Sequence, residues 1–147
     1  MTDLGTLGYP ESESASINTQ GQIVGSSFVF NGPSQGLIWE NGAPPANLNT
    51  LVSPGTTMSV TVAYVINDRG DIACLGLDPD DTDEHACLLV PCDENHPGVE
   101  GCDYSLVDAT TATQSPAPRY VPSGTQRPSQ SRRTNRYHIA GLEAPGR

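Results

Sequence analysis

Short apolar runs alternate with polar turn residues along the chain, and this pattern occurs twice. Residues 14–25 place Ile17, Ile23 and Val24 around a polar turn, and residues 63–74 repeat the arrangement after a shift of 49 positions. A period of this size is typical of solenoids and propellers, in which each unit buries its apolar face against a neighbour. Two units are fewer than such folds usually need, so the sequence predicts part of a larger assembly and a chain that begins partway through a longer parent.

Each copy predicts a hairpin with the same turn chemistry. The first copy has short strands at 14–17 and 22–27, and the second has strands that end at 66 and cover 71–75. Both connecting turns open with Asn, whose side chain can accept hydrogen bonds from the backbone amides ahead of it. Both close with Gly, which adopts a positive φ without steric cost. The sequence therefore predicts two hairpins related by the repeat.

Further strands are expected to complete each unit. Third strands are predicted at 36–39 and 86–90, and the Asn41-Gly42 pair is a strong signal for a two-residue hairpin loop. A weaker fourth strand would contain two leucines in each copy, Leu4 and Leu7 in the first and Leu48 and Leu51 in the second. Three or four antiparallel strands in about 49 residues is the size of a propeller blade.

The predicted fold is therefore all-β, with two short antiparallel sheets that resemble propeller blades and a disordered C-terminal tail. Ile17 and Ile66 are expected at equivalent places in two sheets that pack face to face and cover each other's apolar sides. We expect four parts: a first repeat at 1–48, a second at 49–92, a cysteine-bracketed extension at 93–108 and a basic Ser/Pro/Arg-rich tail at 109–147.

Charge divides the chain near residue 109. The net charge is −10, but residues 1–108 hold 16 acidic residues and one Arg, whereas residues 109–147 hold six Arg and one Glu. An acidic body repels nucleic acid and anionic lipid, so no nucleic-acid partner is expected and only the tail offers attraction to a polyanion. No apolar stretch reaches the roughly 20 residues of a membrane-spanning helix.

The four cysteines are the first candidate site residues. Cys92 and Cys102 bracket a turn-rich loop that can bring both sulfurs together, and in an oxidising compartment a disulfide is the natural interpretation. Cys74 and Cys87 lie on consecutive predicted strands and can face each other across a hairpin. A second disulfide and a pair of buried thiols acting as small hydrophobes remain open for that pair.

Two weaker patterns suggest metal ions. Three cysteines and a histidine are a set that zinc accepts, here without the usual Cys-x2-Cys spacing: Cys87, Cys92, His96 and Cys102. Asp78, Asp80 and Asp83 fall in one acidic loop that faintly resembles the start of a calcium loop. The Gly and the bidentate Glu of such loops are missing, so a solvated acidic hairpin tip is the preferred interpretation. No cofactor is predicted.

The motifs together resemble the HAF-repeat family of extracellular repeats, named for a His-Ala-Phe tripeptide. The resemblance covers about residues 2–91 and departs from the family at Tyr9, at residues 35–37 and at Cys87. It is carried by the residues 3–8, 17–18, 21–26, 37–39, 41–42, 66–70 and 85–89. It implies a secreted or surface-exposed bacterial β-repeat that is propeller-like, with no established activity and no catalytic residues.

The expected function is a non-enzymatic extracellular or cell-surface module that acts as a scaffold or binding surface. Neighbouring repeats or self-association are the expected partners, and a protein or carbohydrate ligand stays unspecified. No nucleophile–base arrangement, phosphate loop or dinucleotide motif is legible in the sequence. Two alternatives are a fragment of a secreted enzyme whose catalytic residues lie in missing repeats, and a polyanion binder acting through Arg127, Arg132, Arg133 and Arg136.

Overall fold

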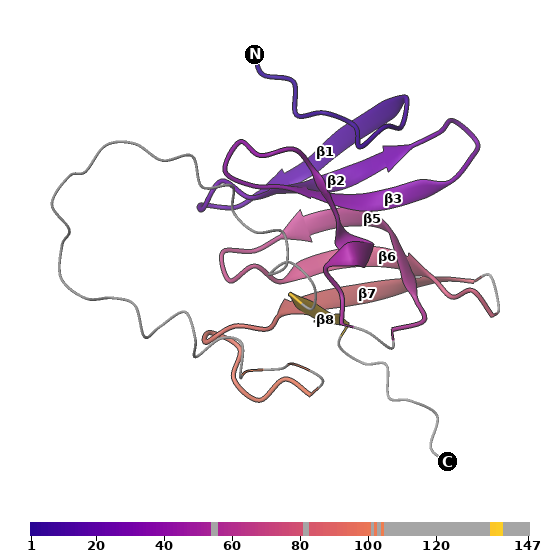
Figure 1. Cartoon of the computed structure of the whole chain (residues 1–147). Helices are drawn as coiled ribbons and strands as arrows, with labels where there is room; N and C mark the ends of the chain where they lie inside the picture. Colours follow the sequence, from indigo (N-terminus) through magenta and orange to yellow (C-terminus); the bar gives the residue numbers. More distant parts are fainter. Residues whose placement is uncertain (54–55, 81–82, 101, 103, 105–135, 140–147) are drawn as a thin grey trace, which may run out of the picture.

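The computed structural model describes residues 1–53, 56–80, 83–100, 102, 104 and 136–139, and these form two four-stranded antiparallel sheets (Figure 1). The prediction of an all-β fold is confirmed. The first sheet has the order β1 (Glu11–Ile17), β2 (Ile23–Phe28), β3 (Ser34–Trp39) and β4 (Ala46–Asn47). The second has the order β5 (Ser59–Ile66), β6 (Ile72–Leu77), β7 (Glu84–Pro91) and β8 (Tyr137–Ile139). A short 3-10 helix, η1 (Leu48–Thr50), follows β4.

The two repeated turns have the same hydrogen bonds. In each, the Asn side-chain oxygen accepts from the backbone amides two and four residues further on, at 3.1 and 3.0 Å for Asn18 and at 2.9 Å twice for Asn67. Gly21 and Gly70 close the turns with φ of 77° and 86°. These are the roles that the sequence assigned to Asn and Gly, so the predicted turn chemistry is confirmed. Asn41 and Gly42 also form a tight turn, with positive φ at both residues and a hydrogen bond from the Ala43 amide to the Glu40 carbonyl at 2.9 Å. The connection between β3 and β4 covers residues 40–45, however, so the predicted two-residue hairpin loop is too short.

Strand pairing preserves the repeat in finer detail. The register of β1 on β2 shifts between Ser14 and Ser16, and that of β5 on β6 shifts between Ala63 and Val65, which are 49 residues further along. Such bulges bend a strand and increase its twist. Next to the turns the two hairpins therefore have the same local shape, while β5 has a further bulge between Val60 and Val62 that β1 lacks.

The turns also stack directly on one another. Asn18 Nδ2 donates to the carbonyl of Asn67 at 3.1 Å, and the amide and hydroxyl of Thr19 both donate to Asp68 Oδ1, at 2.9 and 2.8 Å. Gln20 Nε2 donates to the carbonyl of Asp68 at 2.9 Å. These hydrogen bonds form a polar ladder between residues that are 48 or 49 positions apart, and the ladder fixes the position of one unit relative to the next.

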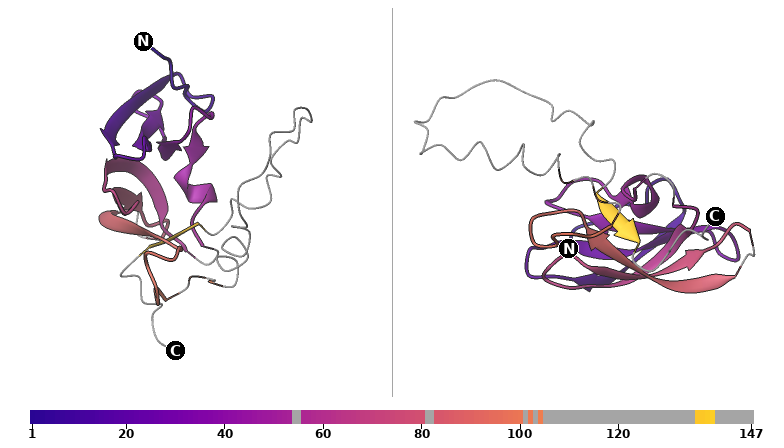
Figure 2. Two further views of the ribbon diagram at one scale, coloured as in Figure 1. Left: turned by 90° about the vertical axis from the view of Figure 1, so that its left-hand side faces the viewer. Right: turned by 90° about the horizontal axis from the view of Figure 1, so that it is seen from below.

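Strand β5 lies against the first sheet, next to β1, β2 and β3 (Figures 1 and 2). Val24 and Ile38, on the face of the first sheet that looks toward β5, share one core with Ile66, Ile72 and Leu89 of the second sheet. The segment between the sheets fills the remaining space, and it contributes the buried residues Leu48, Leu51 and Met58. Burial of these aliphatic side chains is the main force that holds the two units together.

The predicted fourth strands are wrong. Leu4 and Leu7 lie outside strands, and Leu48 starts η1. The fourth strand of the first sheet is instead β4, which pairs with β3 at Leu37 and Ile38. The prediction assigned Leu48 and Leu51 to a strand because they are apolar. In the structure their side chains fill the core between the sheets, and neither residue lies in a strand.

Ile17 and Ile66 have equivalent partners but dissimilar surroundings. They pair with Ile23 and Ile72 respectively, as the repeat requires. Ile66 is 4 % exposed, whereas Ile17 is 64 % exposed. The expectation that both are covered is wrong, because the first sheet lies over the face of the second that carries Ile66, and within the described residues no sheet lies over Ile17.

The predicted tail is not disordered throughout. Residues 137–139 form β8, and this strand supplies the fourth place in the second sheet. The second unit is therefore built from two distant parts of the chain, 59–91 and 137–139. The remainder of the predicted tail, apart from Arg136, lies outside the described residues.

Candidate binding surface

One face of the second sheet is apolar and uncovered. Side chains alternate between the two faces of a strand, and in β6 and β7 both sets are largely apolar. The set that includes Ile72 and Leu89 is buried in the core, and the opposite set faces outward. The register also places Glu84 and His138 on this side. We call the apolar members of the outward set the outer face of the second sheet: Val62, Val65, Ala73, Leu75, Leu77, Ala86, Leu88 and Val90.

The outer face is accessible in the structure. Val65 is 54 % exposed and Leu88 is 42 % exposed, while Ala73 and Ala86 are exposed as well. The other four are partly exposed. A single exposed Leu needs no explanation, but a contiguous apolar sheet face is typical of a surface that binds another protein or another copy.

The corresponding face of the first sheet is covered. By strand register, Val24 corresponds to Ala73 and Ile38 to Leu88, and both first-sheet residues are 1 % exposed or less. Gly36, the counterpart of Ala86, lies so close to the second sheet that an added Cβ would be 2.7 Å from Val60 Cγ1. The second sheet therefore covers this face of the first sheet. Within the described residues, nothing covers the equivalent face of the second sheet in the same way.

Both candidate disulfides are present. Cys74 and Cys87 face each other across β6 and β7 with their Cα atoms 4.9 Å apart, and Cys92 and Cys102 close the loop after β7 with Cα atoms 5.3 Å apart. The alternative of two buried thiols at 74 and 87 is wrong. Disulfides persist in oxidising environments, so the two bridges indicate such an environment for this chain.

The weak zinc candidate is excluded, because Cys87, Cys92 and Cys102 are all consumed by disulfides and have no thiolate to offer. The weak calcium candidate gains no support either. Asp78 Oδ1 accepts from the amide of Asp80 at 3.0 Å, which is an ordinary turn contact, and within the described residues no three acidic, His or Cys side chains gather around a point suited to a metal ion. Asp83 belongs to the described residues and is in no such group.

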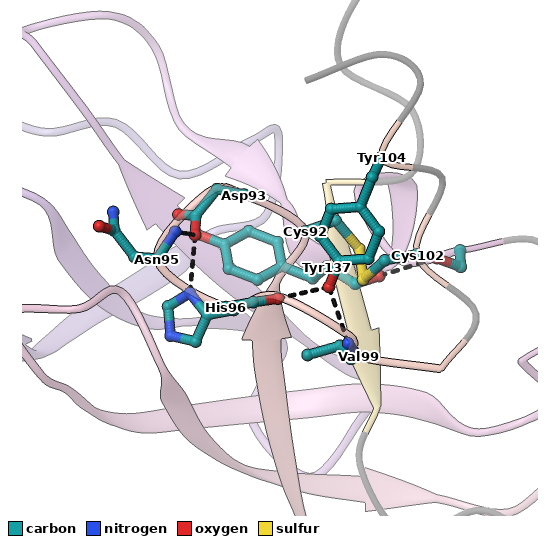
Figure 3. The surroundings of a disulfide bond; sticks show 9 residues. Cys92, Asp93, Asn95, His96, Val99, Cys102, Tyr104 and Tyr137 are labelled. Carbon is teal, nitrogen blue, oxygen red and sulfur yellow. Dashed lines mark hydrogen bonds and ion pairs between the residues drawn. A yellow bond between two sulfur atoms is a disulfide. The ribbon is translucent and has the colours of Figure 1, made fainter. Parts of the chain in front are cut away.

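The loop closed by Cys92 and Cys102 contacts the end of the second repeated turn through His96 and Asp71. Figure 3 shows the loop and its internal contacts. His96 is buried, with Nδ1 2.7 Å from Asp93 Oδ1. Its Nε2 lies 2.9 Å from Asp71 Oδ1 in an ion-pair contact that lacks the alignment of a hydrogen bond. The Tyr104 hydroxyl donates to the carbonyl of His96 and accepts from the amide of Val99 at 2.8 Å. These contacts give the loop a structural role.

Asp71 carries the negative charge of this junction. Its burial favours the neutral acid, but hydrogen bonds from Asn67 and Arg69 and the attraction of His96 outweigh that effect and lower the pKa of Asp71. Asp71 is therefore ionised at neutral pH. Asp68, on the stacked turn, has its pKa lowered by the bonds from Thr19.

A hollow of about 440 Å³ lies on the far side of the first sheet, away from β5. Trp39 is buried there, with an indole N–H that has no hydrogen-bond partner. Trp39 lies outside the core that the two sheets share and lines this hollow together with residues 2–5 and 41–45. Its burial leaves little ring surface for stacking on a ligand.

The arginine of the tail that the structure describes is already paired. Arg136 makes two charge-assisted hydrogen bonds to the carboxylate of Glu40, the one from Nη2 at 2.6 Å. This removes Arg136 from the predicted polyanion site, while Arg127, Arg132 and Arg133 lie outside the described residues.

The sequence predicted neither the Arg136–Glu40 pair nor the outer face of the second sheet. The signal for the outer face was the unbroken apolar run at 72–77, which is typical of a strand covered on both sides.

Comparisons with family models, with curated proteins and with solved structures find no match to this chain. Within the described residues, no helix has the length and apolar character needed to cross a membrane. The chain is thus established as a disulfide-bonded protein of two repeated, stacked β-sheets.

Proposed function

We propose that the protein is a non-enzymatic β-repeat module of the extracellular space or the cell surface, and that it acts as a scaffold by docking a further β-sheet on the outer face of its second sheet. The observation that carries the proposal is the contrast between Val24 and Ile38, which are covered, and their counterparts Ala73 and Leu88, which are exposed. The partner is a neighbouring repeat of a larger propeller-like protein or, in the isolated chain, a second copy.

Three features support this role. The ladder of polar contacts between the turns shows how one unit is registered on the next. The two disulfides suit an oxidising compartment outside the cell. The motifs shared with HAF repeats point to the same class of protein. The apolar outer face then offers the next sheet a surface like the one that β5 and residues 48–58 cover in the first unit.

Sedimentation of the intact chain with a charged substitution on the outer face tests the proposal. The wild-type chain is expected to self-associate, and Leu88→Glu is expected to weaken association at least about tenfold, since a buried unpaired carboxylate costs more than 1.4 kcal/mol. Val29→Glu is the matched control, because Val29 is 39 % exposed but lies in the β2–β3 loop. A wild-type chain that stays monomeric up to millimolar concentration contradicts the proposal.

The alternatives make different predictions. A fragment of a secreted enzyme would show its catalytic groups only when the remaining repeats of the parent are present, and recovery of the upstream reading frame tests that. A polyanion binder would lose its salt-dependent affinity for heparin when Arg127, Arg132 and Arg133 are replaced by Gln. No contact of the described residues favours either alternative over the scaffold.

A further inference from the structure

Strand β8 is held from both sides, although it has only three residues. On one side it pairs antiparallel with β7, with Tyr137 opposite Pro91 and Ile139 opposite Leu89. On the other side the amide of Tyr137 donates to the carbonyl of Leu51, and its carbonyl accepts from the amide of Ser53, both at 2.9 Å. The groove between β7 and residues 51–53 thus binds an extended segment through its backbone, as peptide-binding domains do when they add a strand to a sheet.

Side chains give this groove its selectivity. Tyr137 is fully buried and Ile139 is 2 % exposed, and both belong to the main core. Arg136 adds a bidentate pair with Glu40 of the first sheet and lies over the Tyr137 ring, with 5.3 Å from its guanidinium carbon to the ring centroid. The groove therefore recognises the pattern Arg-aromatic-x-aliphatic, with two apolar anchors and one charge.

The connection to this strand does not dictate which chain supplies it. Thirty-one residues, 105–135, join the described part of the disulfide loop to Arg136, and an extended chain of that length spans up to about 100 Å. A connection that long closes the groove with an effective concentration in the millimolar range or below. A strand from another molecule can therefore compete with the chain's own strand.

We propose that the groove also accepts residues 136–139 of a second copy, so that two chains complete each other's second sheets by exchanging β8. The occupant in trans makes the same backbone bonds and the same Arg136–Glu40 pair as the occupant in cis. Exchange uses the edge of the second sheet and not its outer face, so this inference is independent of the proposed scaffold role and adds a second mode of association.

A charge reversal in two intact chains tests the exchange. Glu40→Arg and Arg136→Glu each place like charges together in cis, but a mixture of the two variants can restore opposite charges in both grooves of an exchanged pair. All chains carry Leu88→Glu so that association through the outer face does not contribute. The mixture is expected to form a 1:1 dimer whose dissociation constant is about 100-fold or more below that of either variant alone. The chain with both reversals is the matched control, and its association should equal that of the chain with neither reversal, because opposite charges then meet both in cis and in trans.

A mixture that remains monomeric while both variants are folded by near-ultraviolet circular dichroism overturns the proposal. A labelled peptide of residues 134–141 decides the question if the charge variants do not fold. Added to the intact chain carrying Tyr137→Ala, it should bind saturably and at least about tenfold more tightly than the same peptide with Tyr137→Ala. Equal binding of the two peptides, or no binding, also overturns the proposal.

Discussion

The two sheets have the same hairpins but are completed in different ways. In the first sheet the fourth strand follows the third directly in sequence, since only residues 40–45 separate β3 from β4. The second takes its fourth strand from beyond residues 92–136. The second sheet also has a disulfide at the Cys74–Cys87 pair, where the first has Gly25 opposite Leu37. One face of the first sheet is covered by the second, and the same face of the second is open.

This difference shows which features belong to the repeat and which belong to the position in the stack. The Asn turns and the bulge next to each turn are determined by nearby residues, so they are the same in both copies. The second bulge of β5, between Val60 and Val62, occurs in the second copy alone. Closure of a sheet by a distant strand carries a larger loop-closure cost, because the entropy lost grows with the length of the connection. The second sheet compensates with covalent links and with the deep burial of Tyr137.

The largest expected effect is at the distant strand. Tyr137→Ala should lower the free energy of unfolding by about 3–5 kcal/mol, because it removes a fully buried aromatic ring from the core. Tyr64→Ala is the control, since Tyr64 is 51 % exposed and should cost less than about 1 kcal/mol. Urea denaturation measures both, and equal effects would mean that β8 does not contribute to the core.

Ionisation of Tyr137 should selectively weaken the second sheet at high pH. Burial raises the pKa of Tyr137 to about 12, above the ordinary value of 10.0. The stabilisation is fully present below pH 10 and is lost as the pH rises from 10 to 12, by about 3 kcal/mol. Hydrogen exchange is too fast at that pH, so the expected loss is measured by urea denaturation at several pH values. Tyr137→Phe should remove this pH dependence, and its persistence in that variant would assign it to another group.

Removal of the cross-strand disulfide should make the second sheet resemble the first. The pair Cys74→Ala and Cys87→Ala is expected to cost about 3 kcal/mol by the chain-entropy estimate for a loop of this length. Amide protection should fall in β6 and β7 and stay unchanged in β2 and β3. Thermal unfolding with hydrogen exchange by residue checks both parts, and uniform loss of protection would contradict separate behaviour of the two sheets.

A single methyl group can distinguish the covered face from the open one. Gly36→Ala should destabilise the protein by about 1–3 kcal/mol, because its Cβ would collide with Val60. The reverse change at the equivalent position, Ala86→Gly, removes an exposed methyl group and should cost about 1 kcal/mol or less in an intact monomer. Chemical denaturation of both variants provides the comparison. A larger cost at position 86 would show that the outer face is already occupied.

The smallest expected effect compares the two repeated turns. Asn18→Ala should cost about 2 kcal/mol and Asn67→Ala about 1 kcal/mol. Both side chains hold their own turn, but the buried Asn18 also donates to the carbonyl of Asn67 in the neighbouring unit. Thermal denaturation of the two variants measures the difference. Equal costs would mean that the stacking contact adds nothing to the turn itself.

The sequence alone determined the local structure of this protein. A period of 49 residues, Asn and Gly at the ends of each turn, and the spacing of Cys92 and Cys102 were enough to predict the hairpins and one disulfide, because each depends on residues that are close along the chain. The sequence left the Cys74–Cys87 pair open between a disulfide and two buried thiols, and the structure decided it. The weak zinc candidate arose because residue type cannot distinguish a thiolate from a disulfide. The predicted fourth strands were wrong because Leu48 and Leu51 are apolar in order to fill the core between the sheets, and not because they lie in a strand.

Only the tertiary structure decided which faces are covered and where the second sheet obtains its last strand. Ile17 and Ile66 both precede an Asn turn and both pair with an isoleucine, yet only Ile66 is covered by another sheet. Tyr137 follows a long polar segment and has no hydrophobic period around it, yet it is one of the most buried residues. Burial depends on what the rest of the chain places on each side of a strand, and a short window of sequence does not contain that information.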